Sequence, residues 1–250
     1  MPDRTLLSAI ILVCALGVHI NALAGTGHAF KAEYEVLVDG KPRLETSIEM
    51  TRVNGSWVLN SEGRGTRGLA RMLRVGSNEI SHVEWSNGRF SPLEFHHHSK
   101  VAGRDERWSA EFDYAADQLL LHHEEGTDQF QISPGAWDPL SLTLELRRRL
   151  AAGETDFEVR VADEDEVDTH HYRASASTRL HTDIGCMTVI ELERIRENSS
   201  RYSRAWYAAE HDFMPLRIQH GKTGGKDFDM RIQKLVIDGA AVQSADTCQP

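Results

Sequence analysis

The sequence lacks the short motifs that identify most hydrolases and metal-binding proteins. It contains no G-x-S-x-G or S-x-x-K motif for a nucleophilic serine, no H-E-x-x-H or C-x-x-C pair for zinc, and no D-x-D-x-D-G calcium loop. Beyond its first 24 residues it also lacks the run of about twenty apolar residues that a membrane helix needs. We therefore expect no cofactor, and the mature chain should have no transmembrane span.

The first 24 residues resemble an export signal. Met1 to Thr5 is short and carries one arginine, Leu6 to Leu23 is mostly apolar, and Ala22-Leu23-Ala24 has the small-x-small pattern that signal peptidase accepts. We predict a signal peptide over residues 1–24 and a single β-rich periplasmic domain over residues 25–250. Because polar residues interrupt the apolar run, an uncleaved anchor is the alternative, and both interpretations imply export.

Cysteine is scarce, with three residues in the chain. Removal of the leader takes Cys14 away and leaves Cys186 and Cys248. An oxidising compartment makes their pairing the natural first expectation. The alternative is a buried thiol at Cys186 and a free thiol at Cys248.

Length and charge indicate one acidic domain. The residues after Ala24 are enough for one large all-β domain with a substantial core. The chain has 28 Lys and Arg residues against 38 Asp and Glu residues, a formal net charge of −10. This charge argues against nucleic acid as a partner.

Turn dipeptides and alternating polarity predict an antiparallel meander. Asp39-Gly40, Asn54-Gly55 and Asn87-Gly88 suit type I′ hairpin turns, in which both central residues have positive φ. Trp108, Ala110, Phe112 and Tyr114 alternate with polar residues, and Phe228, Met230 and Ile232 alternate with Asp229 and Arg231. We predict an all-β fold of roughly ten strands: a large curved antiparallel meander sheet, or open half-barrel, with two short helices.

The two helices are expected where the alternation stops. Leu69, Met72 and Leu73 follow helical spacing, with arginines on the opposite side. Residues 138–153 contain four alternating leucines, but the ends of this segment favour a helix. Asp138 is a good N-cap, Pro139 suits the first turn, and Gly153 suits the position after the helix. Its leucines should contact apolar surface on more than one side.

Gly63, Gly65 and Gly68 have the G-x-G-x-x-G spacing of a dinucleotide site. That site needs a buried parallel strand before the glycines and a full-length helix after them. Here the preceding strand follows an Asn-Gly hairpin and is therefore antiparallel, and the helix is too short. We interpret these glycines as allowing the chain to leave the sheet and place a short helix across its edge or mouth.

Two groups of side chains are candidate sites. His96 and His98 lie on one face of a strand and could bind zinc with a third ligand from His122 or His123, or from His170 or His171. An outward polar strand face explains the same residues without a metal. Arg64, Arg67, Arg71 and Arg74 form a basic patch that could contact an anionic lipid head, and the alternative is a solvated face of ion pairs.

Several segments together resemble domain of unknown function 3108, a family of exported bacterial envelope proteins. The segments that carry the resemblance are Tyr34-Glu-Val-Leu-Val-Asp-Gly40, Gly68-Leu-Ala-Arg-Met-Leu73, Asn87-Gly88 with Pro92-Leu-Glu-Phe95, Phe112-Asp-Tyr114, Asp138-Pro-Leu-Ser141, and Trp206-Tyr207 with Pro215-Leu-Arg-Ile218. The resemblance implies a periplasmic β-rich domain. It implies no established activity and no catalytic residues.

The predicted architecture is also similar to the half-barrel of lipoprotein carriers such as the Lol proteins. Our first hypothesis is a non-enzymatic envelope protein that binds or chaperones an amphiphilic or lipid-like ligand. Leu69, Met72 and Leu73 would be lid contacts, and Arg67, Arg71 and Arg74 would contact the head group. The alternatives are a structural or interaction protein in envelope or polysaccharide assembly and a metallohydrolase around His96 and His98. An inner face filled by the protein's own side chains would favour a scaffold over a carrier.

Overall fold

The computed structural model describes residues 27–101, 103–197, 199–244 and 248. The predicted signal peptide lies outside these residues. Eight strands precede the longer helix: β1 (Phe30–Val38), β2 (Lys41–Val53), β3 (Ser56–Gly65), β4 (Gly76–Ser86), β5 (Arg89–Val101), β6 (Arg104–Asp113), β7 (Gln118–His123) and β8 (Gly126–Phe130). The helices are α1 (Gly68–Met72), between β3 and β4, and α2 (Leu142–Ala151).

Eight strands and one 3₁₀ turn follow α2. The strands are β9 (Asp156–Asp163), β10 (Glu166–Ala174), β11 (Thr178–Thr182), β12 (Gly185–Ile195), β13 (Arg201–Ala208), β14 (Met214–Lys222), β15 (Asp227–Ile237) and β16 (Ala240–Ala241). The 3₁₀ turn is η1 (Ala209–His211). No helix in the described part of the chain is long and apolar enough to cross a bilayer.

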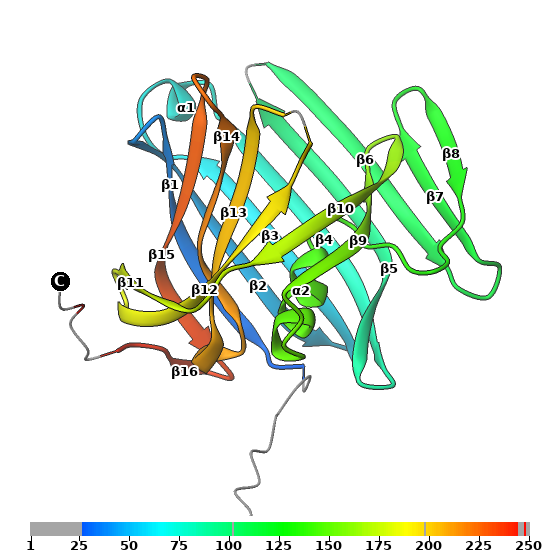
Figure 1. Ribbon diagram of the computed structural model, residues 1–250. Coiled ribbons are helices and arrows are strands. Elements are labelled where there is room, and N and C mark those ends of the chain that lie inside the picture. The colour runs from blue at the N-terminus through cyan, green and yellow to red at the C-terminus, as the bar shows by residue number, and fades with distance from the viewer. Residues whose placement is uncertain (1–26, 102, 198, 245–247, 249–250) are drawn as a thin grey trace, which may run out of the picture.

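All sixteen strands belong to one sheet in the order β8-β7-β6-β5-β4-β3-β2-β1-β15-β14-β13-β12-β10-β9, with β11 beside β12 and β16 beside β15. Neighbouring strands are antiparallel, and the sheet does not close into a barrel (Figure 1). These features confirm the predicted all-β meander. The prediction of roughly ten strands was too low because several turns, such as Glu164-Asp165 between β9 and β10, carry no glycine signal.

The turn dipeptides adopt the predicted geometry. φ is 51° and 69° at Asp39-Gly40, 51° and 91° at Asn54-Gly55, and 52° and 79° at Asn87-Gly88. Positive φ at both central residues matches the twist of the flanking strands. The three turns therefore set the β1–β2, β2–β3 and β4–β5 hairpins.

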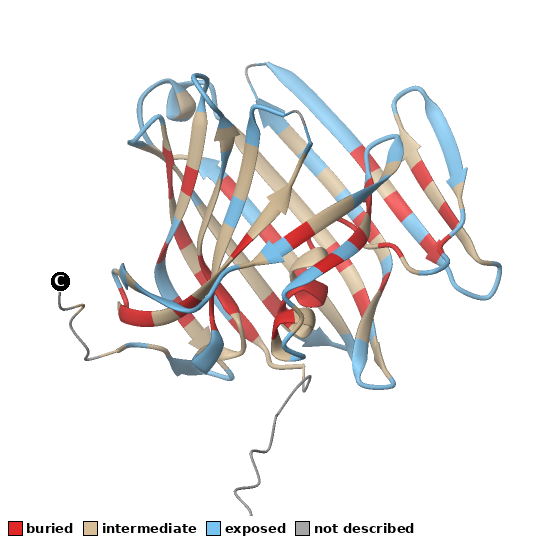
Figure 2. Ribbon diagram, viewed as in Figure 1, coloured by how far each residue is buried: buried red, intermediate tan, exposed pale blue. Residues whose placement is uncertain are grey.

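The apolar faces of the strands point inward, where α2 lies against them (Figures 1 and 2). Leu140 and Leu144 belong to the main core, whereas Leu146 and Leu150 belong to a second cluster with Phe157, Val159, Tyr172, Leu192 and Tyr207. The predicted helix with apolar contacts on more than one side is therefore present. It covers the concave face of the sheet.

Asp229 departs from the predicted alternation. It was expected on the wet face of its strand, but only 5% of it is exposed. Its carboxylate accepts hydrogen bonds from the guanidinium groups of Arg217 (2.8 and 2.9 Å) and Arg231 (2.9 Å). These two side chains cover Asp229 and hold the pKa of its carboxyl below the usual range, although burial alone would raise it.

The glycine triplet is explained by close contacts around α1. A Cβ at Gly65 would lie 2.5 Å from the backbone carbonyl carbon of Ala70, and a Cβ at Gly63 would lie 2.6 Å from the Ser77 hydroxyl oxygen. Gly68 has φ of +57°, a conformation that other residues rarely adopt. The glycines therefore let the chain leave β3 and place α1 close to the sheet, while β3 itself is antiparallel to β2 and β4.

Asp138 anchors α2 to the sheet. Its buried carboxylate accepts hydrogen bonds from the backbone N–H groups of Leu140 (3.0 Å) and Ser141 (2.8 Å). These bonds hold the turn before α2; the helix begins at Leu142 with Ser141 at the N-cap position, later than the N-cap predicted at Asp138. The carboxylate also accepts the hydroxyl protons of Ser141 (2.5 Å) and of Ser81 on β4 (2.8 Å). Burial outweighs these four bonds and raises the pKa of the Asp138 carboxyl to about 6.

We expect Asp138 to make stability depend on pH. Because its native pKa lies above its unfolded value of 3.8, the stability that it contributes below pH 3.8 is lost as the pH rises through about 6, by up to about 3 kcal/mol. Asp138→Asn keeps the shape of the side chain but cannot ionise. The unfolding free energy of the wild type minus that of this variant should therefore fall as the pH rises over that range. Urea unfolding at several pH values measures this difference, and a constant difference would contradict the assignment. Asp138→Ala, which loses all four bonds, should cost about 2–4 kcal/mol.

Candidate functional site

The candidate site lies where the sheet stays open. Residues 131–141 connect β8, one edge of the sheet, to α2, and pass beside β9, the other edge. Trp137 makes a parallel bridge with Val161 of β9. The Arg160 guanidinium donates hydrogen bonds of 2.7 to 2.9 Å to the carbonyl oxygens of residues 131–133. Edge strand β9 thus holds the segment that follows β8, the other edge strand. We call residues 131–141 together with β9 the seam.

Arg147 is the buried charge beside the seam. It projects from α2, and 8% of its side chain is exposed. Its Nε donates to the backbone carbonyl of Asp212 (2.9 Å), its Nη2 forms an ion pair with the Asp212 carboxylate, and its guanidinium carbon lies 5.2 Å from the centre of the Phe30 ring. Its Nη1 is buried and has no hydrogen-bond partner among the described residues. This nitrogen is therefore a buried hydrogen-bond donor that no described group satisfies.

The surroundings of Arg147 are apolar. Burial lowers the pKa of Arg147, and it raises the pKa of the neighbouring Tyr34 and Tyr207 phenols, so both phenols stay neutral. The Tyr34 hydroxyl donates to the carbonyl of Pro215 at 2.8 Å. With neutral phenols on this side, the Asp212 carboxylate is the anion that directly contacts the guanidinium.

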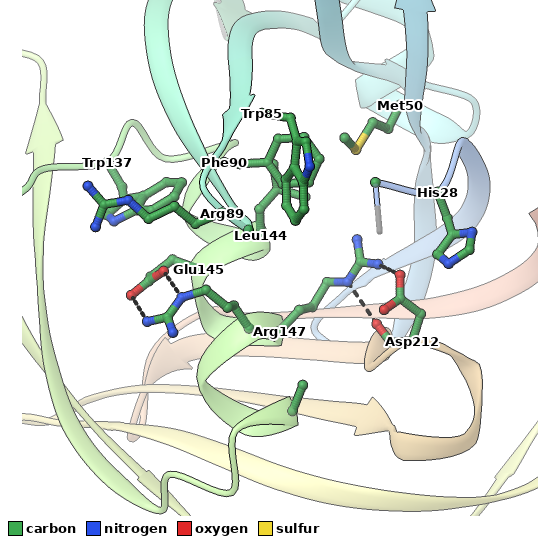
Figure 3. Close-up of a pocket in the computed structure, with 14 residues that line it drawn as sticks. His28, Met50, Trp85, Arg89, Phe90, Trp137, Leu144, Glu145, Arg147 and Asp212 are labelled. Carbon is green, nitrogen blue, oxygen red and sulfur yellow. Dashed lines mark hydrogen bonds and ion pairs between the residues drawn. The ribbon is translucent and has the colours of Figure 1, made fainter. Parts of the chain in front are cut away.

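A small cavity of about 40 Å³ adjoins Arg147 (Figure 3). The side chains of Met50, Trp85, Phe90 and Leu144 surround it, and the Arg147 nitrogen that is not bonded to Asp212 points toward this space. The volume suits one or two water molecules and is too small for an acyl chain. Around α2, the concave face of the sheet is therefore filled by the helix and by core side chains.

An outer groove of about 400 Å³ lies beside the cavity. The two share the residues Arg89, Trp137, Glu145 and Arg148, and the groove is also lined by Tyr114, Pro92 and Val159. Glu145 accepts hydrogen bonds from Arg148 (2.7 and 2.8 Å) and Arg149 (2.7 Å), whereas Arg89 forms no ion pair with any described residue. We call the cavity and the groove together the seam site. It combines aromatic walls with guanidinium groups, a combination that fits an anionic group attached to an apolar body.

Sequence reasoning missed Arg147. The run Arg147-Arg148-Arg149 suits the carbonyl end of a helix, where positive charge is favourable, and this role alone does not mark any of the three as buried. Arg147, however, lies three residues after Leu144 and three before Leu150, so the helical period places it on the apolar side. That spacing was the available signal.

The ion pair of Arg147 with Asp212 should respond unequally to loss of either partner. Asp212 is 30% exposed and can be hydrated when Arg147 is replaced, whereas the guanidinium of Arg147 cannot be. We expect Asp212→Asn to lower the unfolding free energy by about 3 kcal/mol and Arg147→Met by less, as measured by denaturant titration. Glu193→Gln, which breaks the exposed pair with Arg204, is the control and should cost at most about 1 kcal/mol. The reverse order would contradict the burial argument.

The predicted lid residues lie elsewhere. Leu69, Met72 and Leu73 are 67%, 69% and 47% exposed, and α1 lies at the opposite end of the strands from the seam (Figure 1). The basic residues predicted to contact a head group project from the same segment, where Arg67 lies 3.6 Å from the Glu35 carboxylate. In this structure α2 covers the concave face, and α1 does not.

The two histidines predicted as metal ligands point outward. The His96 ring is bonded to Glu94 (2.8 Å) and the His98 ring to Asp105 (2.9 Å), and both side chains are about half exposed. Of the suggested third ligands, His123 is bonded to Asp128 (2.9 Å). Across the described residues, no group of three or more His, Cys, Asp or Glu side chains is arranged to hold a metal ion.

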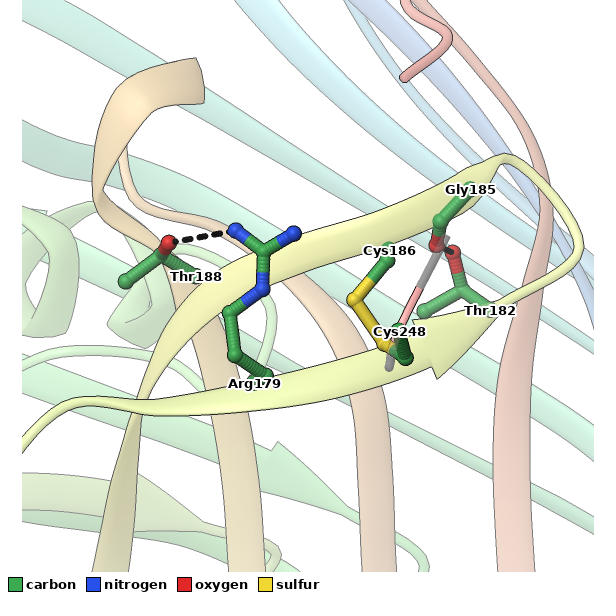
Figure 4. The surroundings of a disulfide bond; sticks show 6 residues. All are labelled: Arg179, Thr182, Gly185, Cys186, Thr188 and Cys248. Atoms are coloured by element: carbon green, nitrogen blue, oxygen red, sulfur yellow. Dashed lines mark hydrogen bonds between the residues drawn. A yellow bond between two sulfur atoms is a disulfide. The ribbon is translucent and has the colours of Figure 1, made fainter. Parts of the chain in front are cut away.

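Cys186 and Cys248 form a disulfide bond, with their Cα atoms 5.2 Å apart (Figure 4). Cys186 is buried at the start of β12. Nearby, the Ser244 amide donates to the carbonyl of Ile184 (2.9 Å), and a Cβ at Gly185 would lie 2.3 Å from the Ser244 carbonyl oxygen. The bond thus ties the C-terminal segment to the β11–β12 hairpin.

Loss of this disulfide should weaken the fold. A cross-link between residues 62 positions apart restricts the unfolded chain, and the chain-entropy relation gives up to about 4 kcal/mol. We expect Cys186→Ser to approach that loss in denaturant unfolding. A reductant should lower the stability of the wild type to a similar extent and leave the variant unchanged. Equal stability of the oxidised and reduced wild type would contradict this role.

Comparison with known proteins gives one family and a distant fold relationship. A family model described as "Protein of unknown function (DUF3108)" matches residues 29–231. A solved β-barrel-like protein of domain of unknown function DUF1849 from Brucella abortus is 11% identical with a TM-score of 0.55, over 84% of this chain and 98% of that chain. This likeness concerns the fold alone.

Two other solved structures superpose too weakly to support any argument. A candidate lipoprotein from Parabacteroides distasonis is 8% identical with a TM-score of 0.36, over 85% of this chain and 97% of that one. A candidate exported protein with a YmcC-like fold from Bacteroides fragilis is 7% identical with a TM-score of 0.35, over the same shares. No curated protein matches the chain.

Proposed function

The chain belongs to the DUF3108 family of proteins of unknown function, and from this premise we propose that it is a non-enzymatic protein of the cell envelope that binds the anionic end of an amphiphilic ligand at the seam site. The observation that carries the proposal is the unpartnered Nη1 of buried Arg147, which faces a space with aromatic walls. A carboxylate or phosphate oxygen would satisfy this donor.

The size of each part of the seam site suggests how the ligand lies. The cavity of about 40 Å³ has room for a few ligand atoms, whereas the groove of about 400 Å³ is within the usual range for small-molecule sites. The anionic end would enter beside Arg147, and the apolar body would lie along Trp137 and Tyr114 in the groove. This mode differs from the half-barrel carriers, because the ligand is not enclosed by the sheet.

The envelope location is part of the proposal. It is supported by the signal peptide predicted over residues 1–24 and by a disulfide bond, which is typical of oxidising compartments. The periplasm is the compartment that fits both features.

A second candidate function is a structural or interaction protein in envelope or polysaccharide assembly. It is favoured by the concave face beside α2, where the helix and core side chains surround a cavity too small for a lipid chain. The two candidates differ in whether a small amphiphile binds to the isolated protein.

The test is titration of detergent-free protein with a fluorescent fatty acid below its micelle concentration. We expect the fatty acid to bind. Its methyl ester, which lacks the charge, should bind at least about tenfold more weakly. Arg89→Gln, at a residue shared by cavity and groove, should also weaken fatty-acid binding. Arg201→Gln, an exposed arginine at the start of β13, is the matched control and should leave binding unchanged.

Two results would overturn ligand binding at the seam. One is the absence of any fatty-acid binding, together with no lipid in native mass spectra of the purified protein. The other is equal affinity for the acid and its methyl ester. Either result would favour the interaction protein.

A further inference from the structure

Exposed apolar side chains gather at the rim of the sheet that carries α1. Seven large apolar side chains are exposed among the described residues, and four of them lie here: Leu69, Met72, Leu73 and Val101. Val101 is the last residue of β5, and the preceding Lys100 is opposite Gly76, the first residue of β4. The tip of the β5–β6 hairpin therefore lies beside the segment that leaves α1. We call these four residues the rim patch.

Six arginines and lysines lie around the rim patch on the α1 segment and the β5–β6 hairpin, and four of them form no ion pair in the described part of the chain. Arg71 and Arg74 on the α1 segment, and Lys100 and Arg104 on the β5–β6 hairpin, are exposed and form no ion pair with any described residue. Arg64 and Arg67 are paired with Glu45 (2.9 Å) and Glu35 (3.6 Å). Of the nearby carboxylates on the hairpin, Asp105 is bonded to His98 and lies 3.1 Å from the Arg107 guanidinium, and Glu106 lies 3.6 Å from the His97 ring.

The neighbouring β14–β15 hairpin extends this positive edge. Its tip lies beside the β1–β2 turn, because Val38 is opposite Phe228, and it carries Lys222 and Lys226, which are exposed and unpaired among the described residues. The whole chain has a formal net charge of −10. Six cations without an ion pair to any described residue therefore lie at the end of the sheet that also exposes the rim patch.

We propose that this rim docks on the surface of an anionic lipid bilayer. The surface of such a bilayer offers negative head groups to the unpaired Arg and Lys side chains and an acyl boundary to the rim patch. A soluble anionic polymer would match the cations only and would leave Leu69 and Met72 in water. In this proposal Arg71 and Arg74 keep the head-group role predicted from the sequence, whereas the apolar residues insert in the bilayer and do not fold over the sheet.

Docking at this edge leaves the seam site facing away from the bilayer. The rim patch and α2 lie at opposite ends of the strands (Figure 1). The inference concerns a surface separate from the seam site and does not depend on ligand binding there.

The experiment is co-sedimentation of the purified protein with lipid vesicles. The protein keeps the N-terminus that the cell leaves on it. We expect binding to vesicles of equimolar phosphatidylglycerol and phosphatidylcholine, at least tenfold weaker binding to phosphatidylcholine alone, and release by salt. Arg71→Gln with Arg74→Gln, and separately Leu69→Ser with Met72→Ser, should each lower the partition coefficient about tenfold. All variants share one N-terminus, so any contribution of that segment cancels.

The matched control lies at the other end of the sheet. Val53 is 49% exposed at the end of β2, and Arg52 precedes it, so Arg52→Gln with Val53→Ser removes the same kinds of groups away from the rim. This control should bind vesicles as the wild type does. An environment-sensitive dye on Met72→Cys should shift to the blue on binding anionic vesicles, and the same dye on Val53→Cys should not.

Three results would overturn the inference. They are no binding to anionic vesicles at low salt, an equal loss of binding in the Val53 control, and no dye shift at position 72. Because the ligand assay uses monomeric fatty acid, it reports on the seam site independently of these results.

Discussion

The concave face of an unclosed sheet has to be covered, and α2 covers it. Two arms of antiparallel strands meet at β1 and β15 and leave apolar faces turned toward each other. Leu144 packs on one side and Leu150 on the other, so one helix joins two clusters that the strands alone would leave apart. This burial removes apolar surface from water, and both the seam and its groove follow from where the helix lies.

A helix in this position brings polar groups into the interior. The beginning of α2 is held by Asp138, whose carboxylate joins the helix to Ser81 on the opposite wall. Arg147, in the second half of the helix, reaches the Asp212 carbonyl and carboxylate. Asp212 and Phe213 both have positive φ, so this turn is held in a conformation that its residues seldom adopt. Anchoring of the helix, burial of charge and local strain thus occur together at the seam, where we propose that a ligand binds.

The sequence predicted the features that depend on neighbouring residues. Asn54-Gly55 sets its hairpin through its own dihedral angles, and Trp108 and Phe112 are buried as strict alternation requires. Prediction from the sequence failed for features that depend on contacts between residues far apart in the chain. Asp229 is buried because Arg217, twelve positions earlier, lies on the adjacent strand. Leu69 is exposed because α1 lies at the end of the sheet away from α2, and the spacing of nearby residues does not indicate this position. For the seam site, helical spacing marks Arg147 as inward, but only the folded chain places its unpaired nitrogen beside Trp85 and Phe90.

The pairing of β1 with β15 has a consequence for the order of assembly. Phe30 is opposite Ile237, so β1 cannot complete its pairing until β15, near the end of the described chain, is present. Strands β1 to β8 can pair by successive hairpins, but one edge of β1 stays unpaired until β15 is present. A chain that stops before β15 would expose that edge to proteases and to other chains. Pairing of β15 with β1 is thus the step that joins the two arms of the sheet.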